Sequence, residues 1–434
     1  MKGIIADLQD QIALLKNGKN SKTSGTPASQ DLARSNSKSL RKKSDRPTGG
    51  QFGHKGKTLE MSSTPDEVVG HYPLFCNGCG STLHSENAQL EHRRQLIEIP
   101  PIVPKHIEHR SYSTTCTGCG TCTVADMPEE LISPVQYGPT VSALVGYLNI
   151  YQYLPYQRIS NLMGGIFQLP ISQGTVKNML SKLAAKATPA YQEIARKVST
   201  SKVIGADETG TRVDNQKAWA FVWQTPSLTY IVTSFSRGFQ TIMDTFPDGF
   251  PNATLLSDCL AAQLKTPSKK KQLCIAHLLR ELENFDTGLN CSWSREVKGL
   301  FYKTLEIRRQ MKPEDFTTEN IRTLGFETRM DLLLAYDLSE KHKKIRAFAK
   351  RLIKYRDSLF TYLYNQDVPP DNNGSERAIR NYKVKNKISG SFRSEEGANI
   401  FAKLSSVVET INKNGLDVLD AFKLLAQDRF YAAE

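Results

Sequence analysis

The sequence lacks any run of about 18 consecutive apolar residues, so it predicts no transmembrane helix. Residues 1–20 lack an apolar segment followed by a cleavage site, and we therefore expect no signal peptide. Acidic residues are in deficit, with 44 Asp and Glu against 57 Lys and Arg, which leaves a net charge of +13. We expect a cytoplasmic chain whose eight cysteines are reduced or bound to metal, and whose basic surplus suits a polyanionic partner.

Hydrophobic periodicity is brief at the N-terminus and then disappears. Aliphatic side chains at steps of 3, 4 and 3 predict a short amphipathic helix over residues 1–16, either a fraying helix or an oligomerisation segment. Residues 17–57 have no hydrophobic period and are rich in Ser, Lys, Gly and Thr. This composition predicts a disordered basic linker that could lie on phosphates without reading a sequence.

Two CxxC motifs within residues 58–130 are the clearest metal signal. Their cysteines are Cys76, Cys79, Cys116 and Cys119. Glycines beside each pair allow the tight turn that points two thiolates at one ion, and four thiolates suit structural Zn²⁺. Cys122 could replace Cys119. Short strands predicted over 95–100 and 106–114 complete a zinc ribbon.

Residues 131–195 have a helical period. Two predicted helices, over 155–163 and 173–187, are joined by a connection that contains Gly and Pro, which is typical of a helix-turn-helix. Ser172 is the predicted N-cap of the second helix, and Lys177 lies near the exposed start that could contact DNA. An ordinary pair of antiparallel helices explains the same pattern.

The hydrophobic period changes from 3.6 to 2 after residue 200, which predicts a sheet over residues 196–290. The predicted strands span 201–208, 217–225, 228–235, 253–259 and 269–277. A short helix is expected before the fourth strand and a longer one after the fifth. This order is that of a ribonuclease-H-like mixed sheet, in which the first and fourth strands are neighbours. Asp207 and Asp258 would then end adjacent strands.

The predicted strand around VIGADETG ends on two adjacent acids. Because side chains alternate along a strand, we expect Asp207 to face the site and Glu208 to face away. Gly205 and Ala206 are small enough to allow another segment to approach closely. The alternative is a strand-end turn, where Asp and Gly are common.

A third acid, Glu376, begins a predicted helix with a basic stripe. Hard cations such as Mg²⁺ prefer oxygen ligands, and two such ions need more than two carboxylates. The basic residues that would position a phosphate backbone are Arg377, Arg380, Lys383 and Lys387. Asn373 and Glu376 also fit a capping box, which is the competing interpretation. His277 and Arg280 are secondary candidates for DNA contact.

The region between the second and third acids is helical. We predict an all-α insertion over residues 291–366, including a long amphipathic helix across 339–364. Residues 367–434 would then supply the catalytic helix and the C-terminal helices. The expected fold is α+β and multidomain, with a zinc ribbon and a helical DNA-binding segment before the core.

Several strings match a known family. They are DETG from Asp207, SDC around Asp258, CIAHLLREL, and NNGSERAIRNYKVKNKISGSFRSEEGA. Over residues 20–425 the chain resembles the IS sixty-six family of bacterial insertion-sequence transposases. The resemblance implies a DDE transposase whose triad is Asp207, Asp258 and Glu376 and whose four CxxC cysteines bind zinc. It also implies accessory proteins encoded by the same element.

We therefore expect metal-dependent DNA cleavage at element ends and strand transfer into target DNA, with Mg²⁺ or Mn²⁺ at the triad. The expected partners are DNA, further copies of the chain on that DNA, and accessory proteins. Two alternatives remain: a ribonuclease-H-like nuclease that only cleaves, and a zinc-ribbon DNA-binding regulator without catalysis.

Overall fold

The computed structural model of the chain describes residues 49, 51–56 and 58–430. The described residues form two units, one that ends at Val103 and one that begins at Pro104. The helix predicted over residues 1–16 and most of the linker predicted over 17–57 lie outside the described residues. Within the described ranges, none of the helices combines the length and the apolarity needed to cross a membrane.

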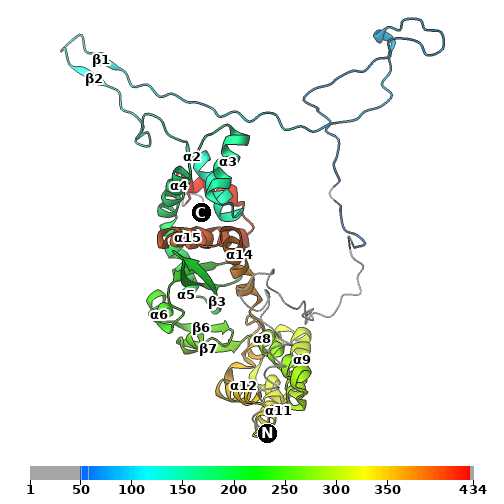
Figure 1. Cartoon of the computed structure of the whole chain (residues 1–434), viewed down its shortest axis with the longest axis vertical. Helices are drawn as coiled ribbons and strands as arrows, with labels where there is room; N and C mark the ends of the chain where they lie inside the picture. The colour runs from blue at the N-terminus through cyan, green and yellow to red at the C-terminus, as the bar shows by residue number, and fades with distance from the viewer. Residues whose placement is uncertain (1–48, 50, 57, 431–434) are drawn as a thin grey trace. The chain divides into compact units, whose positions relative to one another are not determined.

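A five-stranded mixed sheet forms the centre of the larger unit (Figure 1). Its strands are β3 (Val203–Val213), β4 (Gln216–Gln224), β5 (Thr229–Ser234), β6 (Phe250–Ser257) and β7 (Ser268–Leu273). Their order across the sheet is β5-β4-β3-β6-β7. β3 pairs antiparallel with β4 and parallel with β6. The predictions of an α+β chain with a mixed sheet, and of adjacent first and fourth strands, are confirmed.

β3 is longer than predicted. The strand was expected to end on its two acids, but it continues to Val213 and stays paired with β4 from Gly205 to its end. The hairpin turns at Asp214 and Asn215, whose φ angles are +48° and +58°. Asp and Asn are among the residues that tolerate this left-handed conformation in a two-residue hairpin loop. Asp207 therefore lies within β3, although it lies beyond the residues that pair with β6.

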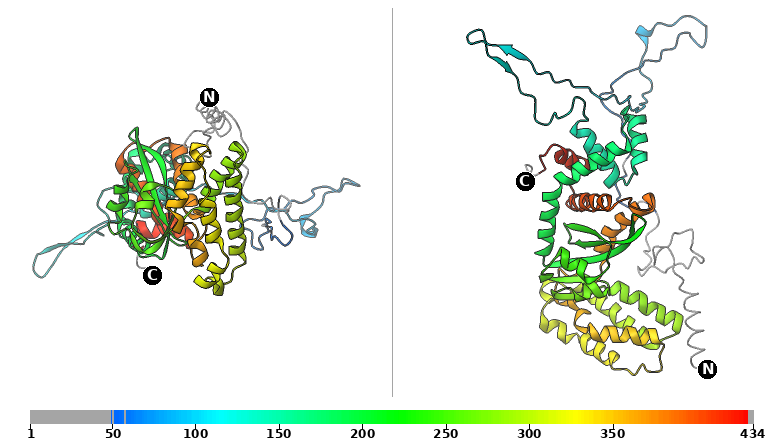
Figure 2. Two further views of the ribbon diagram at one scale, coloured as in Figure 1. Left: turned by 90° about the horizontal axis from the view of Figure 1, so that it is seen from below. Right: turned by 60° about the vertical axis from the view of Figure 1, so that its left-hand side comes forward.

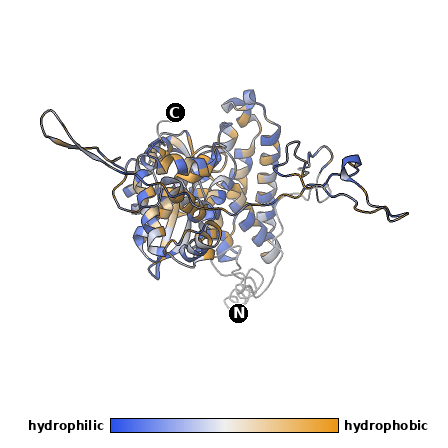
Figure 3. Ribbon diagram, turned by 90° about the horizontal axis from the view of Figure 1, so that it is seen from above, coloured by the Kyte–Doolittle hydropathy of each residue, from blue (hydrophilic) through white to orange (hydrophobic). Residues whose placement is uncertain are grey.

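Helices cover both faces of the sheet. One face carries α14 (Asn373–Ser389) and α15 (Glu395–Lys413), and Thr211 of β3 hydrogen-bonds Asn386 of α14 at 2.8 Å. On the opposite face, the buried Trp223 of β4 packs edge-on against Phe246, which follows α6 (Phe239–Thr245). Figure 3 shows hydrophobic residues concentrated where the helices and strands pack together. The burial of these aromatic side chains is the main source of stability in this region.

Further helices pack on one another and on α15, and they come from both sides of the sheet in the sequence. They are α2 (Pro139–Gly146), the π-helical turn η3 (Tyr147–Tyr151), α3 (Tyr156–Phe167), α4 (Gln173–Lys186), α5 (Thr188–Ser199), and the late α16 (Val418–Ala426). The Ser172 side chain accepts a hydrogen bond from the Thr175 backbone N–H at 3.0 Å, which confirms the predicted N-cap of α4.

A second hydrophobic core lies among the helices that separate β7 from α14 (Figure 2). These are α8 (Ile275–Leu289), α9 (Ser292–Gln310), α10 (Thr318–Thr323), α11 (Phe326–Leu334), α12 (Lys343–Lys354) and α13 (Thr361–Tyr364), with the short α7 (Ala261–Lys265) before β7 and the 3₁₀ turns η4 (Pro313–Asp315) and η5 (Arg356–Ser358). Trp293 and Phe348 are buried at its centre.

The single long helix predicted over 339–364 is wrong. The segment is divided into α12, η5 and α13. Its later residues hydrogen-bond β7: the Tyr362 backbone N–H donates to Gln272, and the Thr361 hydroxyl donates to the Lys271 carbonyl at 2.6 Å. A continuous helix would keep the Tyr362 N–H for itself, so the break permits the helical region to dock on the sheet.

Secondary structure is sparse in the described residues before the first long helix. It consists of the 3₁₀ turn η2 (Ser85–Asn87), an isolated antiparallel bridge between Phe75 and Thr82, and the antiparallel pair β1 (Ser113–Thr115) and β2 (Cys122–Val124). The strand predicted over 95–100 is not formed in the described structure, and Leu96 and Ile99 are exposed. Alternating apolar residues need a partner strand to form a ladder, and this segment has none among the described residues.

Candidate active site

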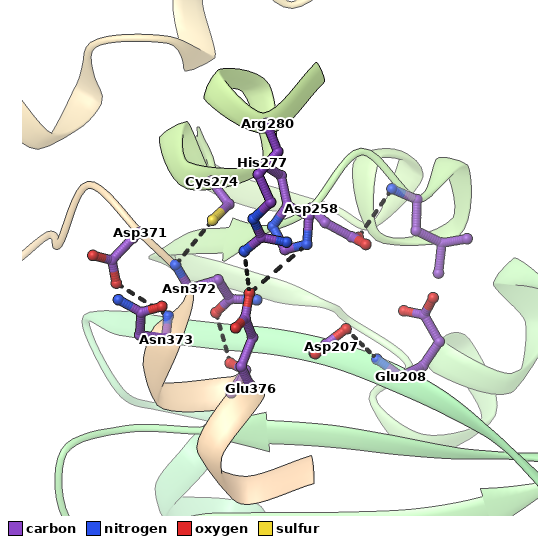
Figure 4. A network of polar contacts seen from close by, with 12 residues as sticks. Asp207, Glu208, Asp258, Cys274, His277, Arg280, Asp371, Asn372, Asn373 and Glu376 are labelled. Carbon is purple, nitrogen blue, oxygen red and sulfur yellow. Dashed lines mark hydrogen bonds and ion pairs between the residues drawn. The ribbon is translucent and has the colours of Figure 1, made fainter. Parts of the chain in front are cut away.

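Asp207 and Asp258 come together because their strands are parallel neighbours. The last residue pair of the β3–β6 ladder is Gly205 with Leu256, and each aspartate follows two residues later in the chain, Asp207 within β3 and Asp258 just after β6. Parallel strands in register carry such residues to the same edge of the sheet. One carboxylate oxygen of each aspartate lies within 4.8 Å of the other and of a Glu208 oxygen (Figure 4). The structure thus brings together two of the three predicted acids.

Glu208 was expected to face away, and this expectation is wrong. Its side chain is on the opposite face of β3 from Asp207, as alternation requires, but β6 has already ended at Ser257. The β6-side edge of β3 is therefore open beside these two residues, and both carboxylates bend around it toward Asp258. Alternation fixes the face on which each side chain leaves the strand, but not where a long side chain ends once the neighbouring strand has stopped.

One Glu208 oxygen has a partner and the other has none. Arg237 donates to Oε1 through Nη2 at 2.5 Å and through Nε at 3.2 Å. Oε2 is buried, and no hydrogen-bond partner for it occurs among the described residues. The Glu208 side chain is 1% exposed. A buried carboxylate oxygen without a partner is energetically unfavourable unless something else binds it.

The three acids oppose one another electrostatically. Burial, then the charges of Asp258 and Glu208, raise the pKa of Asp207 to about 7, whereas Lys383 acts in the opposite direction. Burial and Asp258 likewise raise the pKa of Glu208, against the effects of Arg237 and Lys383. A divalent cation would relieve this repulsion and would use the oxygen ligands that Mg²⁺ and Mn²⁺ prefer. The acids therefore fit such an ion.

Glu376 lies at the start of α14 and contacts α8. Its Oε1 accepts a hydrogen bond from Arg280 Nη2 at 3.0 Å and lies 3.8 Å from His277 Nε2. It is not part of the group formed by Asp207, Glu208 and Asp258. The structure thus pairs the predicted third acid with a predicted DNA-binding residue.

The capping-box interpretation of Glu376 is wrong. The residue at the N-cap position is Asn372 rather than Asn373, and no side-chain capping bond is formed. The Glu376 side chain is therefore directed to Arg280 instead of to the helix start. His277, a secondary candidate for DNA contact, is partly exposed, and burial followed by the Arg280 charge lowers its pKa.

Asn372 fixes the position of α14, and sequence reasoning missed it. Its Nδ2 donates to the Ala206 carbonyl at 2.7 Å, its backbone N–H donates to Cys274 Sγ at 3.2 Å, and its Oδ1 accepts from Ser375 Oγ at 2.7 Å (Figure 4). The residue is 1% exposed. Through its side chain and its backbone N–H, Asn372 therefore joins β3, the start of α8 and α14 beside the acids. Gly205 permits this close approach, as predicted.

A comparison with protein-family models assigns the centre of the chain. The model described as Transposase IS66 family matches residues 134–400, which is more than half of the 434 residues. The chain belongs to the IS66 family of transposases. A search of curated proteins found no match. Asp207, Asp258 and Glu376 lie inside the matched region, and the four CxxC cysteines lie before it.

The basic side chains predicted to contact DNA in this IS66-family chain are distributed over three helices. Those of α14 are all exposed: Arg377, Arg380, Lys383 and Lys387. Lys383 is near enough to influence the pKa of both Asp207 and Glu208. Arg280 of α8 is paired with Glu376, and Lys177 of α4 forms an ion pair with Glu396 of α15 at 2.9 Å. The basic side chains of α14 are therefore exposed to solvent, and one of them, Lys383, lies close to the acids.

The two CxxC motifs adopt the same local turn in separate units. In the unit that ends at Val103, the Cys76 N–H bonds the Ser81 carbonyl at 2.8 Å and the Gly80 N–H bonds the Cys76 carbonyl at 2.9 Å. The larger unit repeats both bonds at the same lengths with Cys116, Thr121 and Gly120. Gly80 and Gly120 each have a φ of +74°, a conformation that glycine adopts readily.

Proposed function

We propose that this IS66-family chain is a DDE transposase that cleaves DNA at the ends of its element and transfers the freed strand into target DNA. The observation that carries the proposal is the convergence of Asp207 and Asp258 just beyond the paired residues of β3 and β6. The family match supports transposition as the biological process. The strand order supports a ribonuclease-H-like core interrupted by an all-α insertion.

In this proposal Asp207 and Asp258 hold divalent cations, and Glu376 is the third ligand. When bound, Mg²⁺ or Mn²⁺ would lower the pKa of an attacking water and stabilise the leaving oxygen of the phosphodiester. Asn372 holds the first turn of α14 against β3, and so fixes the base of Glu376 relative to Asp207.

Glu376 must leave Arg280 to take this role. The two side chains are partly exposed, with 49% of the Arg280 side chain and 31% of the Glu376 side chain accessible. An exposed ion pair of this kind is weak, at about 0–1 kcal/mol. Arg280 would then donate to a DNA phosphate, which is a favourable bidentate partner for a guanidinium. The exposed basic residues of α14 and Lys177 would position the rest of the DNA backbone.

The four CxxC cysteines are proposed to bind structural Zn²⁺ in a zinc ribbon. Support comes from the matching turns at Gly80 and Gly120, which direct paired thiols in the same way. Cys119 occupies the position in its turn that Cys79 occupies in the other, whereas Cys122 begins β2. This correspondence favours Cys119 over Cys122. We further propose a cytoplasmic protein that acts as a homo-oligomer on DNA, together with accessory proteins of the element.

The test is a cleavage and strand-transfer assay on element-end DNA with Mg²⁺. Asp207→Asn, Asp258→Asn and Glu376→Gln should each abolish both products. Asp214→Asn is the matched control, because Asp214 is exposed in the β3–β4 turn and Asn tolerates its positive φ.

Each alternative function predicts a different pattern in the same assay. Cleavage without joined products would indicate a nuclease. DNA binding that ignores both Mg²⁺ and the three acids would indicate a regulator. Full activity in all three acid variants would refute the proposed triad.

A further inference from the structure

The DDE triad does not account for Glu208. This glutamate is almost completely buried, lies beside Asp207 in the sequence, and has one oxygen, Oε2, without a partner among the described residues. If Glu208 served only to hold Arg237, both of its oxygens could have been satisfied by that forked guanidinium. Arg237 instead donates twice to Oε1. Oε2 is therefore available for another ligand.

The available oxygen belongs to a group whose dimensions suit one cation. Asp207, Glu208 and Asp258 each contribute an atom, and these atoms lie within 4.8 Å of one another. Oxygen ligands lie about 2.0–2.6 Å from Mg²⁺ or Ca²⁺, so two ligands of one ion are separated by at most about 4–5 Å. Figure 4 shows the three carboxylates directed toward a common space at the edge of the sheet. Small side-chain movements would suffice to bring them to one ion.

Arg237 prepares Glu208 for this role. Its guanidinium stacks over the Trp219 ring, with 4.6 Å between Cζ and the ring centroid, while it binds Oε1. The guanidinium is thereby held from two sides, and it fixes the rotation of the Glu208 carboxylate. Arg237 also offsets part of the negative charge that three neighbouring acids would otherwise accumulate.

We infer that Asp207, Glu208 and Asp258 form a divalent-cation site that is complete without Glu376, and that Glu208 binds the cation through Oε2. This inference rests on the proposed function, because it assigns a further ligand to the same metal centre. It also assigns an order: the first cation binds the chain alone, and Glu376 joins later. If the site consisted only of the triad, loss of Glu376 would weaken cation binding and loss of Glu208 would not.

The experiment measures Mn²⁺ binding to the full chain without DNA, from the loss of the electron paramagnetic resonance signal of free Mn²⁺. Glu208→Gln should weaken the tightest Mn²⁺ site at least tenfold, whereas Glu376→Gln should change it less than twofold. Gln can still accept the Arg237 hydrogen bonds, so this variant removes the charge with little change in shape. Unfolding midpoints without metal identify any variant that fails to fold.

Arg237→Gln separates metal binding from a structural role. If Glu208 acts as a ligand, Arg237→Gln should weaken Mn²⁺ binding clearly less than Glu208→Gln does, because the Glu208 carboxylate remains and loses only the contact that orients it. If Glu208 matters only because it anchors Arg237, both variants should weaken Mn²⁺ binding alike, and the inference is wrong.

Two further outcomes are decisive. Wild-type affinity in Glu208→Gln, or an equal loss in Glu376→Gln, overturns the inference and leaves the proposed triad intact. Wild-type affinity in Asp207→Asn would refute the metal centre itself, and with it the proposed function.

Discussion

The Gly205→Ala substitution adds one methyl group, which should push α14 away from the sheet. A Cβ added there would lie 2.5 Å from Gln224 Nε2, 2.6 Å from Ser375 Oγ and 2.9 Å from Asn372 Oδ1. The Gln224 amide is at the end of a flexible side chain and can move. Ser375 and Asn372 are fully buried and hydrogen-bonded to each other, so neither can move without losing that bond.

The expected magnitude follows from two opposing effects. Gly→Ala reduces the freedom of the unfolded chain and favours folding by about 0.4–1 kcal/mol. Leaving a buried polar group without its partner costs about 1–3 kcal/mol. Moving Asn372 would weaken two buried hydrogen bonds, the one to the Ala206 carbonyl and the one from Ser375. Gly205→Ala should therefore destabilise the protein by about 2 kcal/mol net.

Gly210→Ala is the matched control on the same strand. A Cβ at Gly210 would meet only Trp219 Cζ3 at 3.7 Å, which is an ordinary van der Waals contact. Neither glycine has a positive φ, so both substitutions are compatible with the backbone. Gly210→Ala should be neutral or should stabilise the protein by about 0.5 kcal/mol.

The assay is urea unfolding monitored by tryptophan fluorescence, since the buried Trp223 pairs with Ala206 beside the substitution. Strand-transfer activity is the second measurement, because displacement of α14 would also displace Glu376. Gly205→Ala should lower both quantities and Gly210→Ala neither. Equal unfolding midpoints for Gly205→Ala and the wild-type chain would show that α14 does not pack closely against β3 at Gly205.

Two further predictions concern a buried lysine and the cysteines. Burial lowers the pKa of Lys385 from 10.5 to about 8, so between these values the unfolded chain holds a proton that the folded protein has released, and stability should rise with pH across that window. Lys385→Met should raise the free energy of unfolding at pH 7 by up to about 3 kcal/mol and should flatten the rise of stability with pH, whereas Lys387→Met, at an exposed position, should do neither. Urea unfolding at several pH values measures both effects. A Lys385→Met protein that is less stable than wild type at pH 7 would contradict the prediction. Cys119→Ser should release bound zinc, measured by inductively coupled plasma mass spectrometry, whereas Cys122→Ser should retain it, and the reverse result would identify Cys122 as the ligand.

The meeting of Asp207 and Asp258 was predictable because it depends only on strand order. Three strands, a helix and a further strand lead to a parallel pairing of the first strand with the fourth. The ladder from Val203 to Gly205 then carries the two aspartates to one edge. Hydrophobic periodicity supplied the order of the elements and the ribonuclease-H-like arrangement supplied the strand neighbours, so no knowledge of side-chain packing was needed.

The breaks and contacts of helices were not predictable in the same way. Apolar residues continue at helical spacing through the break at Tyr355, because both sides of the break still face the same core. The break depends on two hydrogen bonds with Gln272, whose Nε2 donates to the Leu359 carbonyl and whose Oε1 accepts from the Tyr362 N–H. At the start of α14, two consecutive asparagines are equally suited to an N-cap. The tertiary contact of Asn372 with Ala206 determines that Asn372 takes the N-cap position and Asn373 the first helical position.

The misassignment of Glu208 has a different origin, which lies in the length of β6. Had β6 extended two residues further, its backbone would have paired with β3 beside Asp207 and separated the carboxylates of Asp207 and Glu208, which leave β3 on opposite faces. Because it ends at Ser257, the chain turns, and the Leu260 N–H donates to an Asp258 oxygen at 3.2 Å. The same early end thus orients Asp258 and opens the edge of β3. The early end of β6 therefore both forms the site and lets Glu208 reach it. Two adjacent acids on a strand whose neighbour has ended should both be considered as site residues, even though alternation places them on opposite faces.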